Sequence, residues 1–198
     1  MSNKREPGDK GKLFVLSGPS GSGKTTLAAA VLGDKELSAV LERSVSFTTR
    51  PRRRGEKNKR DYFFISEEEF LSRRRKQKIL EWTRYLGYYY GTDKDFVDSR
   101  LEKSKSLILC LDLKGAARIK KLYRKNSITV FVMPPSLEEL SRRIECRHRE
   151  TSGREIAGRL RLAKKEVACS GEFDFCLVNN KLSLAVRDLK KIISAEIF

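Results

Sequence analysis

The chain has 198 residues, of which 39% are hydrophobic, and it carries a formal net charge of +17. That length suits one compact domain with enough apolar residues for a core, and no run approaches the ~20 apolar residues of a membrane-spanning helix. The positive charge fits a nucleic-acid surface, binding of highly anionic small molecules, or solubility alone. Because the basic residues are spread along the chain, a nucleic-acid surface is the weaker interpretation.

Residues 1–12 are charged and have no apolar centre of the kind found in signal peptides, so we predict a flexible leader and a cytoplasmic protein. The four cysteines are Cys110, Cys146, Cys169 and Cys176. Their spacing matches no zinc site, and we predict reduced thiols.

An apolar run at 13–16 leads into a glycine-rich turn and then into a segment of helical composition at 24–32. Further buried strands are predicted at 107–111, 128–132 and 175–178, and helices at 116–124, 136–146, 156–168 and 182–193. Alternating strands and helices favour an α/β fold with a parallel sheet covered by helices on both faces. Together with the glycine-rich turn after the first strand, this order is typical of the P-loop NTPase type. We assign 13–42 and 93–198 to this core.

Two segments depart from the alternation. Residues 43–92 hold short runs rich in Thr, Tyr and Phe at 45–49, 62–65, 80–83 and 88–90, which predict a small β-rich insertion. Residues 147–155 are polar, rich in arginine and contain Gly153, which predicts a short lid between two helices.

The glycine-rich turn fits the pattern G-x-x-x-x-G-K-[ST] at every position, and a strand precedes it while a helix follows. Its residues are Gly18, Pro19, Ser20, Gly21, Ser22, Gly23, Lys24 and Thr25. In such a P-loop the backbone N–H groups and the helix N-terminus surround phosphate oxygens. Lys24 would supply charge to the β and γ phosphates, and the Thr25 hydroxyl would bind Mg²⁺. The motif therefore predicts binding of ATP or a related triphosphate without saying what it is used for.

The insertion carries a second set of motifs: 46–56 (SFTTRPRRRGE), Asp61-Tyr62, Leu80-Glu81-Trp82 and Tyr90-Gly91-Thr92. In order and spacing, from the P-loop almost to the C-terminus, the chain resembles the guanylate kinases, the P-loop nucleoside monophosphate kinases that phosphorylate GMP with ATP. The resemblance implies that 43–92 binds GMP and that the reaction yields GDP within purine nucleotide metabolism. We expect dGMP to be accepted as well, because no assigned motif reads a ribose 2′-hydroxyl.

The acceptor residues make chemical sense for GMP. Arg50 and Arg53 offer guanidinium forks to a dianionic phosphate, and the hydroxyls of Tyr62 and Tyr90 add donors. Guanine presents N1–H and N2–H₂ side by side, and the Glu81 carboxylate can accept from both. The hydroxyls of Ser46 and Thr92 can meet O6 or the amino group. Adenine leaves that carboxylate without donors, so Glu81 is predicted to set base choice.

Other assignments come from the resemblance. Asp112 would contact either the guanine amino group or a water on Mg²⁺, and Asn179 would lie near the adenine of ATP. Arg143, Arg147 and Arg159 match family arginines of the lid and its flanking helices, where positive charge compensates the transferring phosphoryl group. Lys24, Arg50, Arg147 and Arg159 are thus the expected catalytic residues. His148, the only histidine, is expected to be an exposed lid residue, because phosphoryl transfer needs no histidine base.

Several positions depart from the family pattern: Arg52 for a proline, Lys59 for a glycine, Cys110 for an aspartate, Lys114 for a glutamine, and a lid one residue longer. Three alternatives stay open. A related P-loop kinase could act on another acceptor such as a phosphorylated ribose. A guanylate-kinase-like domain could serve as an interaction module, and the charge could serve nucleic acid. The sequence leaves the oligomeric state open.

Overall fold

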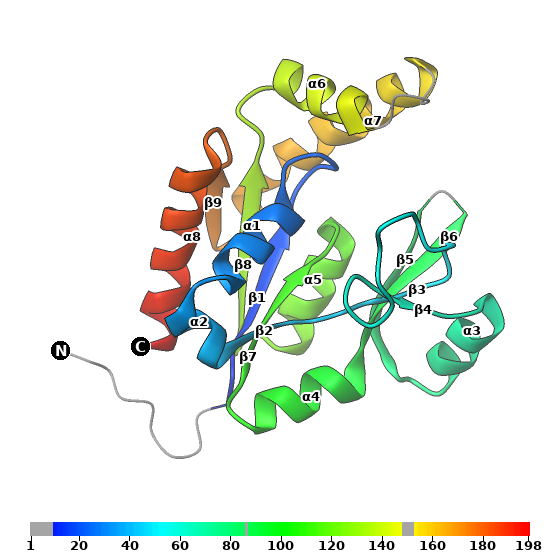
Figure 1. The fold of residues 1–198 in the computed structure, drawn as a ribbon, viewed down its shortest axis with the longest axis vertical. Helices are drawn as coiled ribbons and strands as arrows, with labels where there is room; N and C mark the ends of the chain where they lie inside the picture. The colour runs from blue at the N-terminus through cyan, green and yellow to red at the C-terminus, as the bar shows by residue number, and fades with distance from the viewer. Residues whose placement is uncertain (1–9, 86, 148–152) are drawn as a thin grey trace.

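The computed structural model describes the backbone of residues 10–85, 87–147 and 153–198, and the side chains of these residues except 147 and 153–155 (Figure 1). Its main sheet has five strands that pair in parallel. In spatial order they are β2 (Leu41–Arg43), β7 (Ser106–Cys110), β1 (Leu13–Ser17), β8 (Ser127–Met133) and β9 (Phe175–Val178). Because the strands are parallel, all their carboxyl ends meet at one edge, where ligands of open α/β sheets bind.

Helices cover both faces of this sheet, which confirms the predicted fold class (Figure 1). Alternate side chains of the fully buried β1 enter two different cores, as a pleated strand requires. Phe14 and Leu16 pack with α1 (Lys24–Leu32), α2 (Lys35–Val40) and α8 (Leu182–Ile197). Leu13 and Val15 pack with α4 (Lys94–Glu102) and α5 (Leu113–Leu122).

Two helices pack together beside the carboxyl ends of the main-sheet strands (Figure 1). Helices α6 (Leu137–Arg147) and α7 (Gly153–Ala168) share a small core of Leu140, Ile144 and Ala163. This core reaches the P-loop, because a Cβ on Gly21 would lie 3.1 Å from Leu140 and 3.3 Å from Ile144. A 3₁₀ turn, η1 (Ser170–Glu172), then leads from α7 into β9.

The predicted short β runs form a second sheet beside the first, with α3 (Glu67–Arg75) packed against it (Figure 1). Its order is β4 (Phe63–Phe64), β3 (Phe47–Thr48), β6 (Tyr88–Asp93) and β5 (Ile79–Tyr85). The register of β5 against β6 shifts between Ile79 and Trp82. Such a bulge re-aims side chains, and here it sets Leu80 and Glu81 opposite Thr92.

Besides the short turn η1, one strand and three helices of the described chain escaped the sequence analysis: β2, α2, α3 and α4. Helix α3 shows why, because it has three glutamates at one end, three arginines at the other, and Phe70 as its only buried residue. Helix α5 begins at Leu113 rather than at the predicted 116, because the Asp112 side chain caps it by accepting from Gly115 N–H at 2.7 Å. The boundaries assigned to leader, insertion and lid stay predictions.

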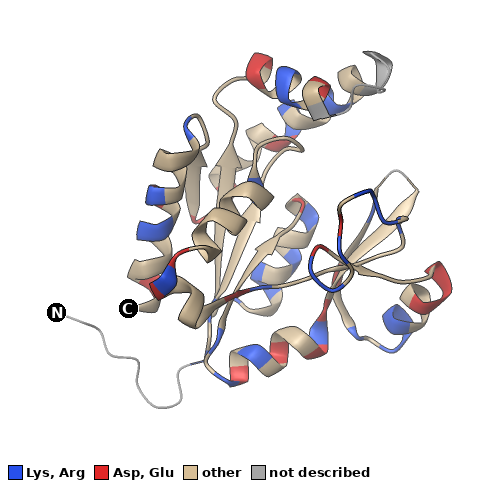
Figure 2. Ribbon diagram, viewed as in Figure 1, with Lys and Arg blue, Asp and Glu red and all other residues tan. Residues whose placement is uncertain are grey.

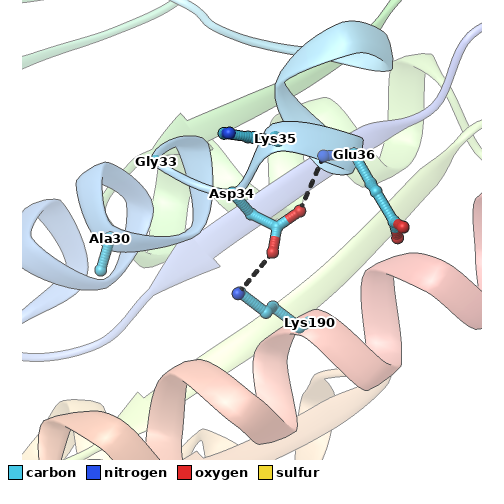
Figure 3. A pocket seen from close by; sticks show the side chains of 6 residues that line it. All are labelled: Ala30, Gly33, Asp34, Lys35, Glu36 and Lys190. Carbon is cyan, nitrogen blue, oxygen red and sulfur yellow. Dashed lines mark hydrogen bonds and ion pairs between the residues drawn. The ribbon is translucent and has the colours of Figure 1, made fainter.

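Asp34 ties the turn between α1 and α2 to α8 (Figure 3). Its carboxylate accepts from the backbone N–H groups of Glu36 and Leu37, and Lys190 of α8 donates to it at 2.6 Å. The hydrogen bond from Lys190 holds the pKa of Asp34 below its ordinary value. Asp34 and Lys190 line a hollow of about 580 Å³ and neutralise each other there. We therefore interpret this ion pair as a structural link between the helices.

Candidate active site

The P-loop occupies the carboxyl end of β1 and enters α1. Gly18, Gly21 and Gly23 all have positive φ, which side chains other than glycine rarely adopt. Space restricts two of them further: a Cβ on Gly18 would lie 2.5 Å from the Val132 carbonyl oxygen, and one on Gly23 would lie 2.2 Å from Nδ2 of Asn179. The Lys24 ammonium donates to the carbonyls of Gly18 at 2.6 Å and Pro19 at 3.0 Å, which holds its charge within the loop.

Asn179 and Arg143 brace this loop. Asn179 follows β9, is almost fully buried, and donates from Nδ2 to the Ser22 carbonyl at 2.8 Å. Arg143 of α6 donates to the Asn179 carbonyl at 3.2 Å and to Glu139 Oε1 at 2.8 Å. Of the two residues outside the loop that the sequence assigned to ATP, Asn179 bonds directly to the P-loop backbone and Arg143 bonds to Asn179.

The remaining loop side chains differ in burial. The Ser22 hydroxyl is buried and finds no hydrogen-bond partner among the described residues. Ser20 and Thr25 are exposed, and Thr25 stands in the first turn of α1. A buried hydroxyl without a partner in the described chain, set in a glycine-rich loop at a helix N-terminus, suits a loop that binds an anion.

Arg50 lies in the bend that follows β3 and is buried, with only 9% of its surface exposed. Its guanidinium donates to the Pro51 carbonyl and to Glu56 Oε1, each at 2.7 Å, and lies over the Tyr62 ring at 5.6 Å. Glu56 also accepts from the Arg53 backbone N–H at 2.8 Å. Burial works to raise the pKa of Glu56, but the hydrogen bonds from Arg50 and Arg53 hold it below its ordinary value. One carboxylate therefore orders both arginines of the motif, although the Arg53 side chain is exposed.

Two tyrosines lie beside Arg50 in the same part of the insertion. The Tyr62 and Tyr90 rings meet edge to face, with centroids 5.9 Å apart. Burial raises the pKa of Tyr62, so its phenol stays protonated as a donor. Ser46 stands at the junction of the two sheets, where its carbonyl accepts from Phe63 N–H at 2.9 Å.

Glu81 is a buried acid whose pKa is strongly raised. It is 7% exposed, and Thr92 Oγ1 donates to its Oε1 at 2.5 Å. Its Oε2 lies over Gly115, where a Cβ would come within 2.8 Å. Burial raises the pKa of Glu81 to about 7, the Thr92 hydrogen bond opposes the shift, and the Asp112 charge adds to it. The fold therefore joins Glu81 of β5, Thr92 of β6 and Asp112 before α5 in one place.

Two residues that act on this site, Glu166 and Arg43, were not assigned to it from the sequence. Glu166 of α7 is half-buried, and burial raises the pKa of its carboxyl while Lys24 lowers it and Asp112 raises it. Burial likewise raises the pKa of the Cys110 thiol, against the charges of Lys24 and Arg43. Arg43 and Glu166 thus act electrostatically on the site from β2 and α7, which only the folded chain brings together. No motif signals either one.

Of the arginines assigned to the lid and its flanking helices, the structure describes the side chains of Arg143 and Arg159. Arg159 is half-buried on α7. The Arg147 side chain, His148 and most of the lid, 147–155, lie outside the described residues.

Known proteins match the chain along almost its whole length. The guanylate kinase family model matches residues 10–196. The chain belongs to the guanylate kinase family. It is 43% identical to the guanylate kinase of Thermotoga maritima and 41% identical to that of Polaromonas, in each case over 94% of this chain and 88% of the relative. The crystal structure of guanylate kinase from Anaplasma phagocytophilum superposes with a TM-score of 0.77 at 30% identity, covering 96% of this chain and 88% of that one.

This membership confirms the resemblance and the activity predicted from it. Guanylate kinases transfer a phosphoryl group from ATP to GMP, giving GDP, and this chain is an enzyme of that kind. ATP-dependent transfer of this type requires a divalent metal. None of the helices in the described part of the chain is long and apolar enough to cross a membrane.

Proposed function

We propose that Glu81 selects guanine. The main support is that the Glu81 carboxylate is buried and accepts a hydrogen bond from Thr92 through one oxygen. Its other oxygen lies beside Gly115, close to Asp112. In this proposal the carboxylate accepts from guanine N1–H and N2–H₂, while the Ser46 and Thr92 hydroxyls meet O6 or the amino group. Asp112 takes the amino group or a water on the metal. Discrimination against adenine follows, because adenine would leave a buried carboxylate without donors.

Residues 43–92 form the GMP-binding insertion in this proposal. Arg50, Arg53, Tyr62 and Tyr90 bind the acceptor phosphate. Arg50 is already oriented by Glu56 and by the Tyr62 ring, so little side-chain entropy is lost when phosphate binds.

On the donor side, Gly18 to Thr25 surround the ATP phosphates, and Arg143 and Asn179 bind the nucleotide beside them. We assign charge compensation during direct in-line transfer to Lys24, Arg50, Arg147 and Arg159. Distributed positive charge is what this reaction needs, because its transition state spreads negative charge over the oxygens of the moving group.

Mg²⁺ is the metal we propose, with the Thr25 hydroxyl as its protein ligand. Among the described residues, no cluster of three or more His, Cys, Asp or Glu could hold a metal by itself. Few protein ligands suit Mg²⁺, which retains waters and binds mainly to substrate phosphates. When bound, the ion would neutralise charge on the β- and γ-phosphate oxygens.

We further propose that dGMP is a substrate, that nucleic acid is not a partner, and that the protein works in the cytoplasm. All four cysteines are free thiols, as a reducing compartment favours. Microscopy of a tagged copy of the full chain tests the location.

A panel of acceptors with ATP and Mg²⁺ tests the site assignment: GMP, dGMP, AMP, dTMP and a ribose bisphosphate. We expect turnover of GMP and dGMP alone, and a Glu81→Ala variant that loses GMP use far more than ATP binding. Wild-type kcat/KM for GMP in Glu81→Ala would show that another group reads the base.

A further inference from the structure

A groove lies between the second sheet and α5, and Glu81 and Gly115 of the candidate base site are among the residues that line it. It has a volume of about 560 Å³. Arg74 of α3, Trp82 of β5, and Lys114, Arg118 and Leu122 of α5 stand along it, with Ile79 deeper. Lys114, Arg118 and Leu122 recur every four residues, so they form one stripe of the helix.

Most cations of this groove form no ion pair with the described part of the protein, although the buried Glu81 carboxylate also lines the groove. Lys94 at its edge pairs with Asp98 at 2.8 Å. Arg74, Lys114 and Arg118 are exposed and form no ion pair with any described residue. Figure 2 shows the basic residues along α5 and on α3. The net charge of +17 adds a long-range field of the same sign. An anionic partner is therefore attracted, and a second copy of this chain is repelled.

The groove is also apolar and aromatic. Trp82 and Leu122 are each 45% exposed, which is high for such large side chains. The Arg74 guanidinium lies 4.7 Å from the centre of the Trp82 ring, and the Tyr89 ring packs against Trp82 at a tilt, with centroids 5.7 Å apart. A nucleobase stacking on Trp82 would have to displace the guanidinium, whereas an aliphatic side chain can insert between Trp82 and Leu122.

We propose that this groove binds an acidic peptide segment of a partner protein. Its carboxylates pair with Lys114 and Arg118, and an apolar side chain packs against Trp82 and Leu122. Exposed tryptophan and arginine with an apolar centre and a charged rim are the composition of binding hot spots.

Trp82 is the only tryptophan of the chain, so its fluorescence reports on this groove directly. The probe is a synthetic peptide of repeated Glu-Glu-Leu, titrated into the full-length protein, with a Lys-Lys-Leu peptide as its charge-reversed counterpart. We expect a saturable change in Trp82 emission with the acidic peptide only. The double variant Lys114→Glu/Arg118→Glu should weaken that binding by on the order of tenfold or more, because both attractions become repulsions.

The matched control is Lys121→Glu/Lys125→Glu, which makes the same change in net charge on exposed residues outside the groove. Circular dichroism establishes that both variants are folded, and the milder Lys114→Gln/Arg118→Gln replaces the first if it is not. An equal loss in the control would mean unspecific attraction and overturn the proposal. So would an unchanged Trp82 emission. Tighter, groove-dependent binding of oligothymidylate would assign the groove to nucleic acid instead.

Discussion

Gly115 gives the sharpest test of how the guanine site is built. The residue stands in the first turn of α5, where its N–H holds Asp112 Oδ1 at 2.7 Å. An added methyl group would lie 2.8 Å from Glu81 Oε2, 3.2 Å from Leu111 Cβ and 3.3 Å from Asp112 Oδ1. We therefore predict that Gly115→Ala displaces the two carboxylates assigned to the base.

The size of the effect follows from these distances. Ordinary contacts of a Cβ begin at about 3.4 Å and contacts under 3.0 Å are essentially never seen, so the Glu81 carboxylate must shift by a few tenths of an ångström or more. Its hydrogen bond from Thr92 is already short, so the movement spoils the geometry toward the base as well. Losing one well-formed hydrogen bond to a charged group corresponds to ~1.5–3 kcal/mol, or roughly a 10- to 150-fold loss in kcat/KM for GMP.

Steady-state kinetics with each substrate varied in turn measures this loss. KM for GMP should rise while KM for ATP stays within about twofold, since no P-loop atom is touched. The control is Gly158→Ala in α7, where a Cβ meets nothing within 4 Å and helix propensity adds up to ~1 kcal/mol of stability. An unchanged KM for GMP in Gly115→Ala, or equal rises for both substrates, would refute the close packing of Glu81 on this helix.

The remaining predictions concern single contacts. Glu56→Gln leaves Arg50 with a neutral partner, so KM for GMP should rise several-fold in steady-state assays, and an unchanged KM would contradict a positioning role for Glu56. Asn179→Leu removes the donor to Ser22 and should lower the melting temperature and weaken ATP binding by calorimetry; the buried carbonyl left unpaired costs ~1–3 kcal/mol. Finally, the stability of the wild type should fall between about pH 4.5 and about pH 7 relative to that of Glu81→Gln, as worked out below.

The sequence predicted features whose cause is local. The apolar run at 13–16, the glycine pattern after it and the helix at 24–32 sit side by side in the chain, and the structure places β1 and α1 there. The motif around Arg50 is local too, since the guanidinium bonds to residues one and six positions later. Such features depend on neighbours within a few residues, which a sequence displays directly.

What escaped prediction depends on distant packing. The charges of Lys24 and Asp112 act on the pKa of Glu166 only because α7 folds back beside the sheet. No sequence periodicity predicts that packing. The bulge that aims Glu81 at Thr92 is a property of the pairing between β5 and β6. Helix α3 forms although its sequence is almost wholly polar, since Ser66 caps it and Phe70 anchors it.

The protonation state of Glu81 connects base selection to the free energy of unfolding. Burial raises its folded-state pKa from 4.5 to about 7, so the folded protein holds this proton more tightly than the unfolded chain does. As pH rises from about 4.5 to about 7, the unfolded state ionises freely while the folded one resists, so the free energy of unfolding falls, by roughly 3 kcal/mol in all. Glu81→Gln cannot ionise and should escape this loss, so its melting temperature relative to wild type should climb across that window. Parallel pH profiles for the two proteins would show that the carboxylate ionises easily, and that guanine then meets a solvated acid rather than a buried one.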